Sequence, residues 1–371
     1  MFQAIPELFR TGLAFLVVLG VLVFVHELGH YLAARWVGVH VEVFSIGFGK
    51  AIATWRDRVG TVWKLAWLPL GGYVKLHGQE RLEDATPEVR ASWIPGRTFH
   101  TKAVWARAIV VAAGPIANFL LAMVLFAALF AVAGRPVTEP VVGDVLPDSA
   151  AAHAGLRIDD RILTIGGAPI ETFEDIQRII AEHPAEKMSL TVRRGDATMQ
   201  VPVLTGARDT GGGTKAGVLG IAGGRVEYER LSLPDALWGG VIQTWQVTHE
   251  TIVGVGQMIS GRRGTEDLGG PLRIAQLSGQ VAQLGLASLV SFIAVLSVNL
   301  GLINLFPIPV LDGGHLLFYL AEAIRGRPLP ARAQEYGFRA GLAFLAGLFV
   351  FATWNDLTHL GIFNWVARLI G

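Results

Sequence analysis

Residues 12–36 read GLAFLVVLGVLVFVHELGHYLAARW. The run is apolar almost to its end, and about 20 such residues are enough for a helix to cross a bilayer. Within it lies the motif HELGH, residues 26–30. Ionisable side chains cost about 2.5 kcal/mol or more at the centre of a membrane, so they indicate a functional site. The stretch therefore predicts a transmembrane helix that carries such a site.

The two histidines of this motif lie one helical turn apart along the axis and about 40° apart around it. The imidazoles of His26 and His30 can therefore reach one metal ion. Glu27 lies about 100° from His26, beside the ion, where its carboxylate can take a proton from a water molecule. The alternative is a chance pattern, or a pair of histidines that only pack.

The composition also favours a membrane protein. Of the 371 residues, 52% are hydrophobic and 16% are charged, whereas soluble domains carry about 25% charged residues. This balance argues against a disordered chain, a nucleic-acid binder and an ordinary soluble enzyme. The formal net charge is +1, so no bulk attraction to polyanions is expected. The chain has no cysteine, which excludes disulfides, thiolate metal sites and cysteine catalysis.

Three further apolar runs are long enough to span a membrane, at residues 104–133, 285–306 and 337–357. The loops between the first two spans and between the last two are rich in Lys and Arg, which predicts a cytoplasmic location for both. We therefore expect a polytopic α-helical membrane protein with four transmembrane helices. Residues 238–259 predict an amphipathic helix at the membrane surface, with a fifth span as the alternative.

A catalytic zinc site needs a third protein ligand, and without cysteine a carboxylate is expected. Asp312, in the run NLFPIPVLDGGH of residues 304–315, is the outstanding candidate because irregular backbone at membrane depth lines a protein cavity. The alternatives are that Asp312 caps a helix in a cytoplasmic turn, or that Asp356 or Glu322 is the ligand. Asn304 could donate to a developing oxyanion, or it could satisfy the backbone of the broken helix.

These paired motifs resemble the site-2 protease family of intramembrane zinc metalloproteases. The runs FSIGFGK at 44–50, LPLGGYVK at 68–75 and AGPIAN at 113–118 are similar to its bacterial branch, which includes the regulator-of-sigma-E protease. The resemblance covers nearly the whole chain. It implies one Zn²⁺ per chain, held by three ligands, with a general acid/base and a polar group near the scissile carbonyl. The implied zinc ligands are His26, His30 and Asp312. Glu27 is the implied general acid/base, and Asn304 is the implied polar group near the scissile carbonyl.

The loop at residues 41–80 is predicted to contain a membrane-associated β-hairpin, because residues 59–74 alternate around turn glycines. A transmembrane substrate hides its peptide bonds in its own hydrogen bonds, so cleavage requires local unwinding. An exposed strand edge could capture the unwound segment as an added strand, and the family is similarly thought to use its hairpin. We therefore predict substrate binding by Gly71, Gly72 and Tyr73, with a purely structural hairpin as the alternative.

The central region, residues 138–229, is polar, and its run VLPDSAAAHAGLRIDDRILTIGG at 145–167 resembles a PDZ domain. Such an α+β domain binds an extended peptide as an added strand and often holds its terminal carboxylate on backbone N–H groups. We predict that Val141, Val142 and Gly143 form this carboxylate site. The regulator-of-sigma-E branch carries two PDZ domains, whereas the space here fits one.

Four segments follow. Residues 1–137 are expected to form the N-terminal membrane part, 138–229 a periplasmic PDZ domain, 230–284 an amphipathic surface-helix region and 285–371 the C-terminal membrane part. Both termini are expected to lie in the periplasm if the cell is Gram-negative.

The resemblance implies a zinc endopeptidase of the bacterial inner membrane that cleaves transmembrane segments of single-pass proteins. Its substrates would be trimmed first by an upstream site-1-type protease; an anti-sigma factor or signal-peptide remnants are examples. The bilayer is the other expected partner, and no nucleic acid is expected. The rival interpretations are a catalytically inactive membrane scaffold that presents a PDZ domain, and a metal transporter. Transport would need several intramembrane ligands along a path, and the sequence offers one compact cluster.

Overall fold

The computed structural model describes residues 4–79, 85–209, 215–262, 264 and 269–359. The chain divides into two compact units, which are described separately. A membrane unit comprises Met1–Leu129 and Leu233–Gly371, and a central unit comprises Phe130–Ser232. The central unit contains the predicted domain at 138–229 and extends beyond it at both ends.

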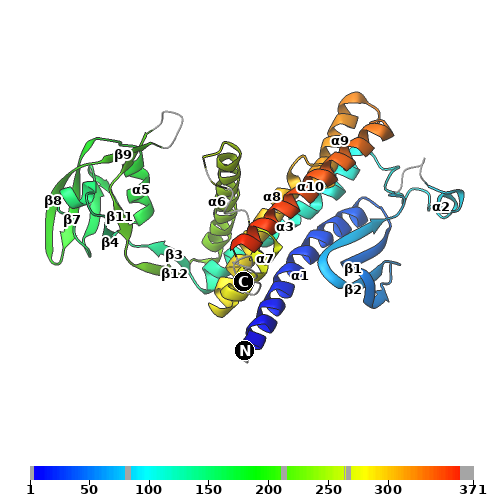
Figure 1. Ribbon diagram of the computed structural model, residues 1–371, viewed down its shortest axis with the longest axis horizontal. Helices are drawn as coiled ribbons and strands as arrows, with labels where there is room; N and C mark the ends of the chain where they lie inside the picture. Colours follow the sequence, from blue (N-terminus) through cyan, green and yellow to red (C-terminus); the bar gives the residue numbers. More distant parts are fainter. Residues whose placement is uncertain (1–3, 80–84, 210–214, 263, 265–268, 360–371) are drawn as a thin grey trace, which may run out of the picture. The chain divides into compact units, whose positions relative to one another are not determined.

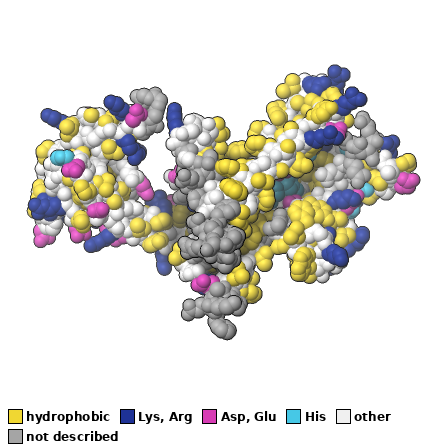
Figure 2. All heavy atoms as spheres, in the orientation of Figure 1, with side chains coloured by type: hydrophobic (Ala, Val, Ile, Leu, Met, Phe, Trp, Pro, Cys, Tyr) yellow, Lys and Arg dark blue, Asp and Glu magenta, His cyan; other side chains and the backbone are white. Residues whose placement is uncertain are grey.

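Four helices in the described residues are long and apolar enough to cross a membrane, as predicted. They are α1 (Ala4–Trp36), α3 (Val104–Val132), α8 (Leu286–Leu305) and α10 (Ala331–His359) (Figure 1). No more than a third of each apolar window is buried in the isolated chain, and Figure 2 shows hydrophobic side chains over much of the surface of this unit. An apolar surface of this size is unfavourable in water and suits lipid. The helix α6 (Leu233–Ile259) is not among the four.

Apolar side chains bring α1 and α8 together. Val18 and Leu22 of α1 pack against Ile293 of α8 in one buried cluster. The helix α7 (Pro271–Gln283) lies against α1, and its first turn is capped from α10. Asp356 is buried, and its carboxylate accepts hydrogen bonds from the backbone N–H groups of Gly270, Leu272 and Arg273. Such charge-assisted caps satisfy donors that a helix start leaves unpaired.

A two-stranded sheet follows α1, formed by β1 (Val41–Arg56) and β2 (Val62–Leu76). The turn between them, residues 57–61, is closed by the Asp57 carboxylate, which accepts from the N–H groups of Val59 and Thr61. The prediction that residues 59–74 form a hairpin by themselves is wrong. These residues belong to the turn and to β2, and their partners lie upstream in β1. Periodicity alone does not reveal which neighbouring segment a strand pairs with.

The sheet is more folded than a simple hairpin. Ser45 pairs with Lys64 on one side and with Tyr73 on the other, while Thr54 also pairs with Lys64. The chain therefore bends sharply between residues 46 and 51. Gly47 has a φ of +88°, a value that favours glycine, and it lies in this bend. As a result, residues 72–75 of β2 pair with β1 along one side.

The connection from α8 back to α10 contains a shorter helix, α9 (Asp312–Arg325), which begins directly after the proline-rich turn. The short helix α2 (Pro87–Ala91) lies in the loop after β2.

The central unit has an α+β fold. Its largest sheet has four strands in the order β6-β5-β7-β8, and three two-stranded pairs accompany it: β4 with β11, β3 with β12, and β9 with β10. The strands are β3 (Arg135–Thr138), β4 (Val142–Val145), β5 (Arg161–Ile165), β6 (Ala168–Pro169), β7 (Lys187–Arg194), β8 (Ala197–Leu204), β9 (Gly206–Asp209), β10 (Lys215–Val218), β11 (Ile221–Gly223) and β12 (Val226–Glu229). The helices are α4 (Ala150–His153) and α5 (Phe173–Ala181).

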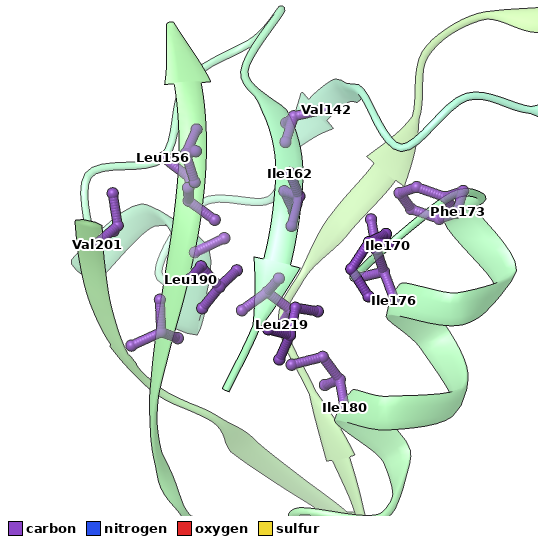
Figure 3. Packing of buried hydrophobic residues seen from close by; sticks show 14 residues of the cluster. Val142, Leu156, Ile162, Ile170, Phe173, Ile176, Ile180, Leu190, Val201 and Leu219 are labelled. Atoms are coloured by element: carbon purple, nitrogen blue, oxygen red, sulfur yellow. The ribbon is translucent and has the colours of Figure 1, made fainter. Parts of the chain in front are cut away.

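The core of this unit lies between α5 and the strands (Figure 3). Ile176 and Ile180 of α5 point toward Ile162 and Leu190, and all four are buried. Burying an aliphatic side chain of this size stabilises a fold by about 1.5–3 kcal/mol. A capping box between Thr172 and Asp175 starts α5.

A buried ion pair supports the same unit. The side chain of Asp160 is fully buried and accepts two hydrogen bonds of 2.7 Å from the guanidinium of Arg194 and one of 2.8 Å from the N–H of Arg157. Burial by itself raises the pKa of a carboxyl group, but these donors outweigh it. The pKa of Asp160 therefore lies below its ordinary value.

Candidate metal centre

The two histidines of the HELGH motif face the same point. His26 and His30 lie on one side of α1, and their Nε2 atoms are 3.2 Å apart. Asp312 approaches from α9, with its Oδ2 atom 3.2 Å from Nε2 of His26 and 3.5 Å from Nε2 of His30. One ligand atom from each residue lies within 4.8 Å of the others, which makes a candidate metal cluster. The structure thus brings together the three predicted ligands, although His30 follows His26 by 4 positions and Asp312 follows His30 by 282.

The position of Asp312 depends on the turn between α8 and α9. A Cβ on Gly313 would lie 2.3 Å from the carbonyl oxygens of Leu305 and Phe306, so only glycine permits the chain to fold back this closely. Val310 has a φ of +94°, an outlier for a β-branched residue. Asp312 is the first residue of α9. The N-cap position is Leu311, and no side chain forms a capping hydrogen bond there. The alternative role of Asp312 as a helix cap is therefore not observed.

The donor atoms fit a divalent metal ion. Oδ2 of Asp312 is buried and has no hydrogen-bond partner among the described residues, although both Nε2 atoms face it. Nδ1 of His30 donates to the carbonyl oxygen of Val110 over 2.8 Å, so in the neutral ring Nε2 keeps its lone pair. Two imidazole nitrogens and one carboxylate oxygen form a donor set that zinc accepts in catalytic sites, with a fourth position left open.

A cavity of about 780 Å³ opens beside this cluster. Among the residues that line it are His26, Glu27, His30, Gly72, Asn304 and Asp312. Glu27 is 9% exposed. Its carboxylate is thus largely shielded from water yet borders the space that a substrate would occupy.

Strand β2 passes directly over Glu27. A Cβ on Gly72 would lie 2.9 Å from Cγ of Glu27 and 2.7 Å from the carbonyl oxygen of Ser45. Only a residue without a side chain lets the strand approach this closely. Tyr73 also lines the cavity. Gly71 is not among the residues that line it; this glycine has a φ of +142° and lies against the ring of Phe48.

The other predicted candidates have different roles. Asn304 lies in the last turn of α8, and its Nδ2 donates to the carbonyl oxygen of Leu300 over 3.0 Å. This contact is made to the backbone of its own helix, and the second amide hydrogen remains for another acceptor in the cavity. Glu322 pairs with Arg107 over 2.7 Å, and Asp356 caps α7, so neither joins the cluster.

Sequence reasoning did not find the ion pair of Arg107 and Glu322 as part of this site. Both side chains line the cavity, and the guanidinium of Arg107 lies 4.9 Å from the ring centre of Tyr319. These contacts join α3 to α9, the helix that begins with Asp312. The signal available was one charged residue in each of two largely apolar segments: Arg107 was interpreted as a topology signal, and Glu322 as an alternative metal ligand.

The predicted carboxylate site of the central unit is contradicted for two of its three residues. The N–H of Val141 donates to the carbonyl oxygen of Glu139 over 2.7 Å, and that of Val142 donates to the carbonyl oxygen of Asp160 over 2.8 Å. Because both donors are already used inside the fold, they cannot hold a peptide carboxylate. Gly143 packs closely as well, since a Cβ there would lie 2.4 Å from a neighbouring Cα.

Comparisons with known proteins match almost the whole chain. The sequence profile described as peptidase family M50 matches residues 14–348. A protein of Rhizobium meliloti with the name "Putative zinc metalloprotease" is 45% identical over 363 residues, which cover 93% of this chain and 96% of the relative. Metalloprotease MmpA of Caulobacter vibrioides is 37% identical over 387 residues, which cover 95% of this chain and 97% of the relative.

A solved structure aligns with a smaller part of this chain. The crystal structure of the PDZ domain of the SdrC-like protein from Listeria monocytogenes aligns with 23% of this chain and 86% of that chain, at 22% identity. The TM-score of 0.20 is too low to establish a common fold.

Proposed function

The chain belongs to peptidase family M50, the site-2 protease family, and we propose that it cleaves peptide bonds within the transmembrane segments of single-pass membrane proteins. It is a zinc metalloprotease and a multi-pass membrane protein. The observation that carries the proposal is the convergence of His26, His30 and Asp312 beside Glu27, on helices that are suited to lipid.

The chemistry assigns one task to each of these side chains. His26, His30 and Asp312 would hold one zinc ion, which polarises a carbonyl group and makes water more acidic when it is bound. Glu27 takes a proton from the attacking water and passes it to the leaving amine. Asn304 can donate its second amide hydrogen to the oxygen of the scissile carbonyl.

The edge of β2 suits an unwound substrate. Residues 72–75 pair with β1 on one side, and several of them border the cavity next to Glu27. A substrate segment that adds to this edge as a strand replaces its lost helical hydrogen bonds with ladder hydrogen bonds. Gly72 and Tyr73 would then contact the segment beside the reacting bond. Gly71 supports the strand from a position that does not border the cavity.

The central unit is proposed to be a PDZ domain on the periplasmic side of a bacterial inner membrane, with both chain termini on that side. Its antiparallel strands and the packed helix α5 support the fold, and the Lys- and Arg-rich loops support the orientation. In this position it limits access to substrates that an upstream site-1-type protease has trimmed. Anti-sigma factors and signal-peptide remnants are substrates of the required kind.

The test is a comparison of cells that carry the wild type with cells that carry Glu27→Gln. The variant keeps the size of the side chain and loses the proton acceptor, so zinc content should remain near one per chain while cleavage falls about 10²–10⁴-fold. Uncleaved single-pass proteins should then accumulate in the membrane fraction. Glu250→Gln, at an exposed position of α6, is the matched control.

Two rival functions make different predictions for the same experiment. A scaffold tolerates Glu27→Gln, so an unchanged population of membrane proteins would refute the protease proposal. A metal transporter releases its metal, so loss of zinc from the wild type on dialysis would favour transport.

A further inference from the structure

We propose that Asn118 of α3 is a positioning residue that holds His26 with its Nε2 lone pair directed at the metal. The inference rests on the proposed metal centre and extends it beyond the three ligands. Asn118 is completely buried, and its Nδ2 atom lies 3.1 Å from Nδ1 of His26. The proposed role requires the amide in its flipped orientation, with Oδ1 at this position.

This contact is the only hydrogen bond that the Asn118 side chain makes within the described part of the chain. Its second polar end is buried and has no partner there. The two ends of an amide have the same shape, and a half turn about the Cβ–Cγ bond exchanges them. With Oδ1 toward the ring, the amide accepts a hydrogen bond from Nδ1–H of His26, and Nε2 is then unprotonated. With Nδ2 toward the ring, Nε2 carries the proton and cannot bind a metal.

His30 is already held in this way. Its Nδ1 donates to the carbonyl oxygen of Val110, also on α3, over 2.8 Å. The same helix thus supplies one outer partner to each histidine, a backbone carbonyl for His30 and a side-chain amide for His26. Metal-binding histidines usually donate their second ring nitrogen to such a group, which sets the tautomer and the ring orientation.

Asn118 is itself fixed from the other side. The hydroxyl of Ser297 on α8, also fully buried, donates to the backbone carbonyl of Asn118 over 2.8 Å. A Cβ on Gly301, one turn further along α8, would lie 3.3 Å from the Cβ of Asn118. The helix α8 therefore holds this part of α3 against α1. A side chain held this firmly has little freedom to turn away from the ring.

The experiment measures zinc affinity of the full-length protein in detergent, by competition with a chelator. Asn118→Leu keeps the volume and removes the acceptor, so zinc affinity should fall about 10–100-fold. Asn118→Asp keeps an acceptor oxygen for Nδ1–H, so its affinity should stay within about threefold of the wild type. Thr244→Val is the matched control, because Thr244 is buried and its hydroxyl donates to the Gly240 carbonyl of its own helix.

The proposal is overturned if Asn118→Leu binds zinc as tightly as the wild type, or if Asn118→Asp loses as much affinity as Asn118→Leu. The second result would mean that Asn118 matters for packing alone. If Asn118→Leu does not fold, the comparison of Asn118→Asp with Asn118→Ala decides in the same way. The metal centre itself is tested separately by His26→Ala. If that variant keeps the wild-type affinity, the centre is wrongly placed, whatever the Asn118 variants do.

Discussion

The substitution Gly114→Ala should damage the metal centre although it adds only one methyl group. Gly114 lies on α3 opposite His30, and a Cβ at this position would be 2.3 Å from Nε2 and 2.5 Å from Cε1 of that ring. Non-bonded atoms of this kind rest about 3.5 Å apart. The ring or the helix must therefore move by about 1.2 Å.

A shift of that size is large for a metal site. Ligand distances in zinc sites vary by about 0.2 Å, and a misplacement of about 1 Å can cost about 100-fold in rate. We expect Gly114→Ala to lose at least about 100-fold in cleavage of a transmembrane substrate. Its zinc content after gel filtration in the presence of a chelator should fall below one per chain.

The control is Gly20→Ala on α1. No atom lies within 4 Å of a Cβ at Gly20, so the added methyl group meets open space. Alanine is favoured over glycine in a helix by about 1 kcal/mol, and this variant should keep full activity and zinc. If folded Gly114→Ala keeps wild-type zinc content and activity, then either His30 is not a ligand or the contact with α3 is looser than the structure indicates.

Three further predictions concern the same chain. Asp312→Ala should lower zinc content because it removes the third ligand; metal analysis that finds one zinc per chain would reject this ligand. Gly72→Ala should slow cleavage at least tenfold with zinc retained, since its Cβ would lie 2.9 Å from Cγ of Glu27; an unchanged rate would argue against the close approach of β2. Asp160→Asn should destabilise the central unit by about 2–3 kcal/mol at pH 7, because it removes a charged partner of Arg194. The folded pKa of Asp160 is lowered, so its contribution is present above the unfolded pKa of about 4 and is lost as pH falls through the folded value. Thermal unfolding of the two proteins should therefore converge in acid, and a difference that persists there would contradict this assignment.

The membrane helices were predictable because the bilayer imposes a local rule. A spanning helix must satisfy its own backbone and present apolar side chains over about 20 residues, so the signal lies within each segment. The four predicted spans each coincide with a long apolar helix. The sheet of β1 and β2 follows no such rule. Strand pairing joins segments by register, and the partners of residues 62–66 lie on two separate parts of β1.

The carboxylate site predicted at Val141 and Val142 failed for a related reason. The resemblance of residues 145–167 to a PDZ domain placed the peptide-binding loop at these residues, but the sequence does not reveal whether their N–H groups are free. In the fold, neighbouring carbonyl groups of Glu139 and Asp160 accept these donors. Whether a backbone N–H group is already hydrogen-bonded is known only from the tertiary structure.

By itself, the sequence determined which side chains can perform the chemistry. The spacing of His26, Glu27 and His30 is a property of one helix, and the absence of cysteine directs the search for a third ligand to a carboxylate such as Asp312. The tertiary structure decided how these groups are held. Val110 and Asn118 are 80 and 92 positions from the histidines that they contact, and the approach of α3 depends on Gly114. Contacts between helices this distant in sequence depend on packing, which local periodicity does not encode.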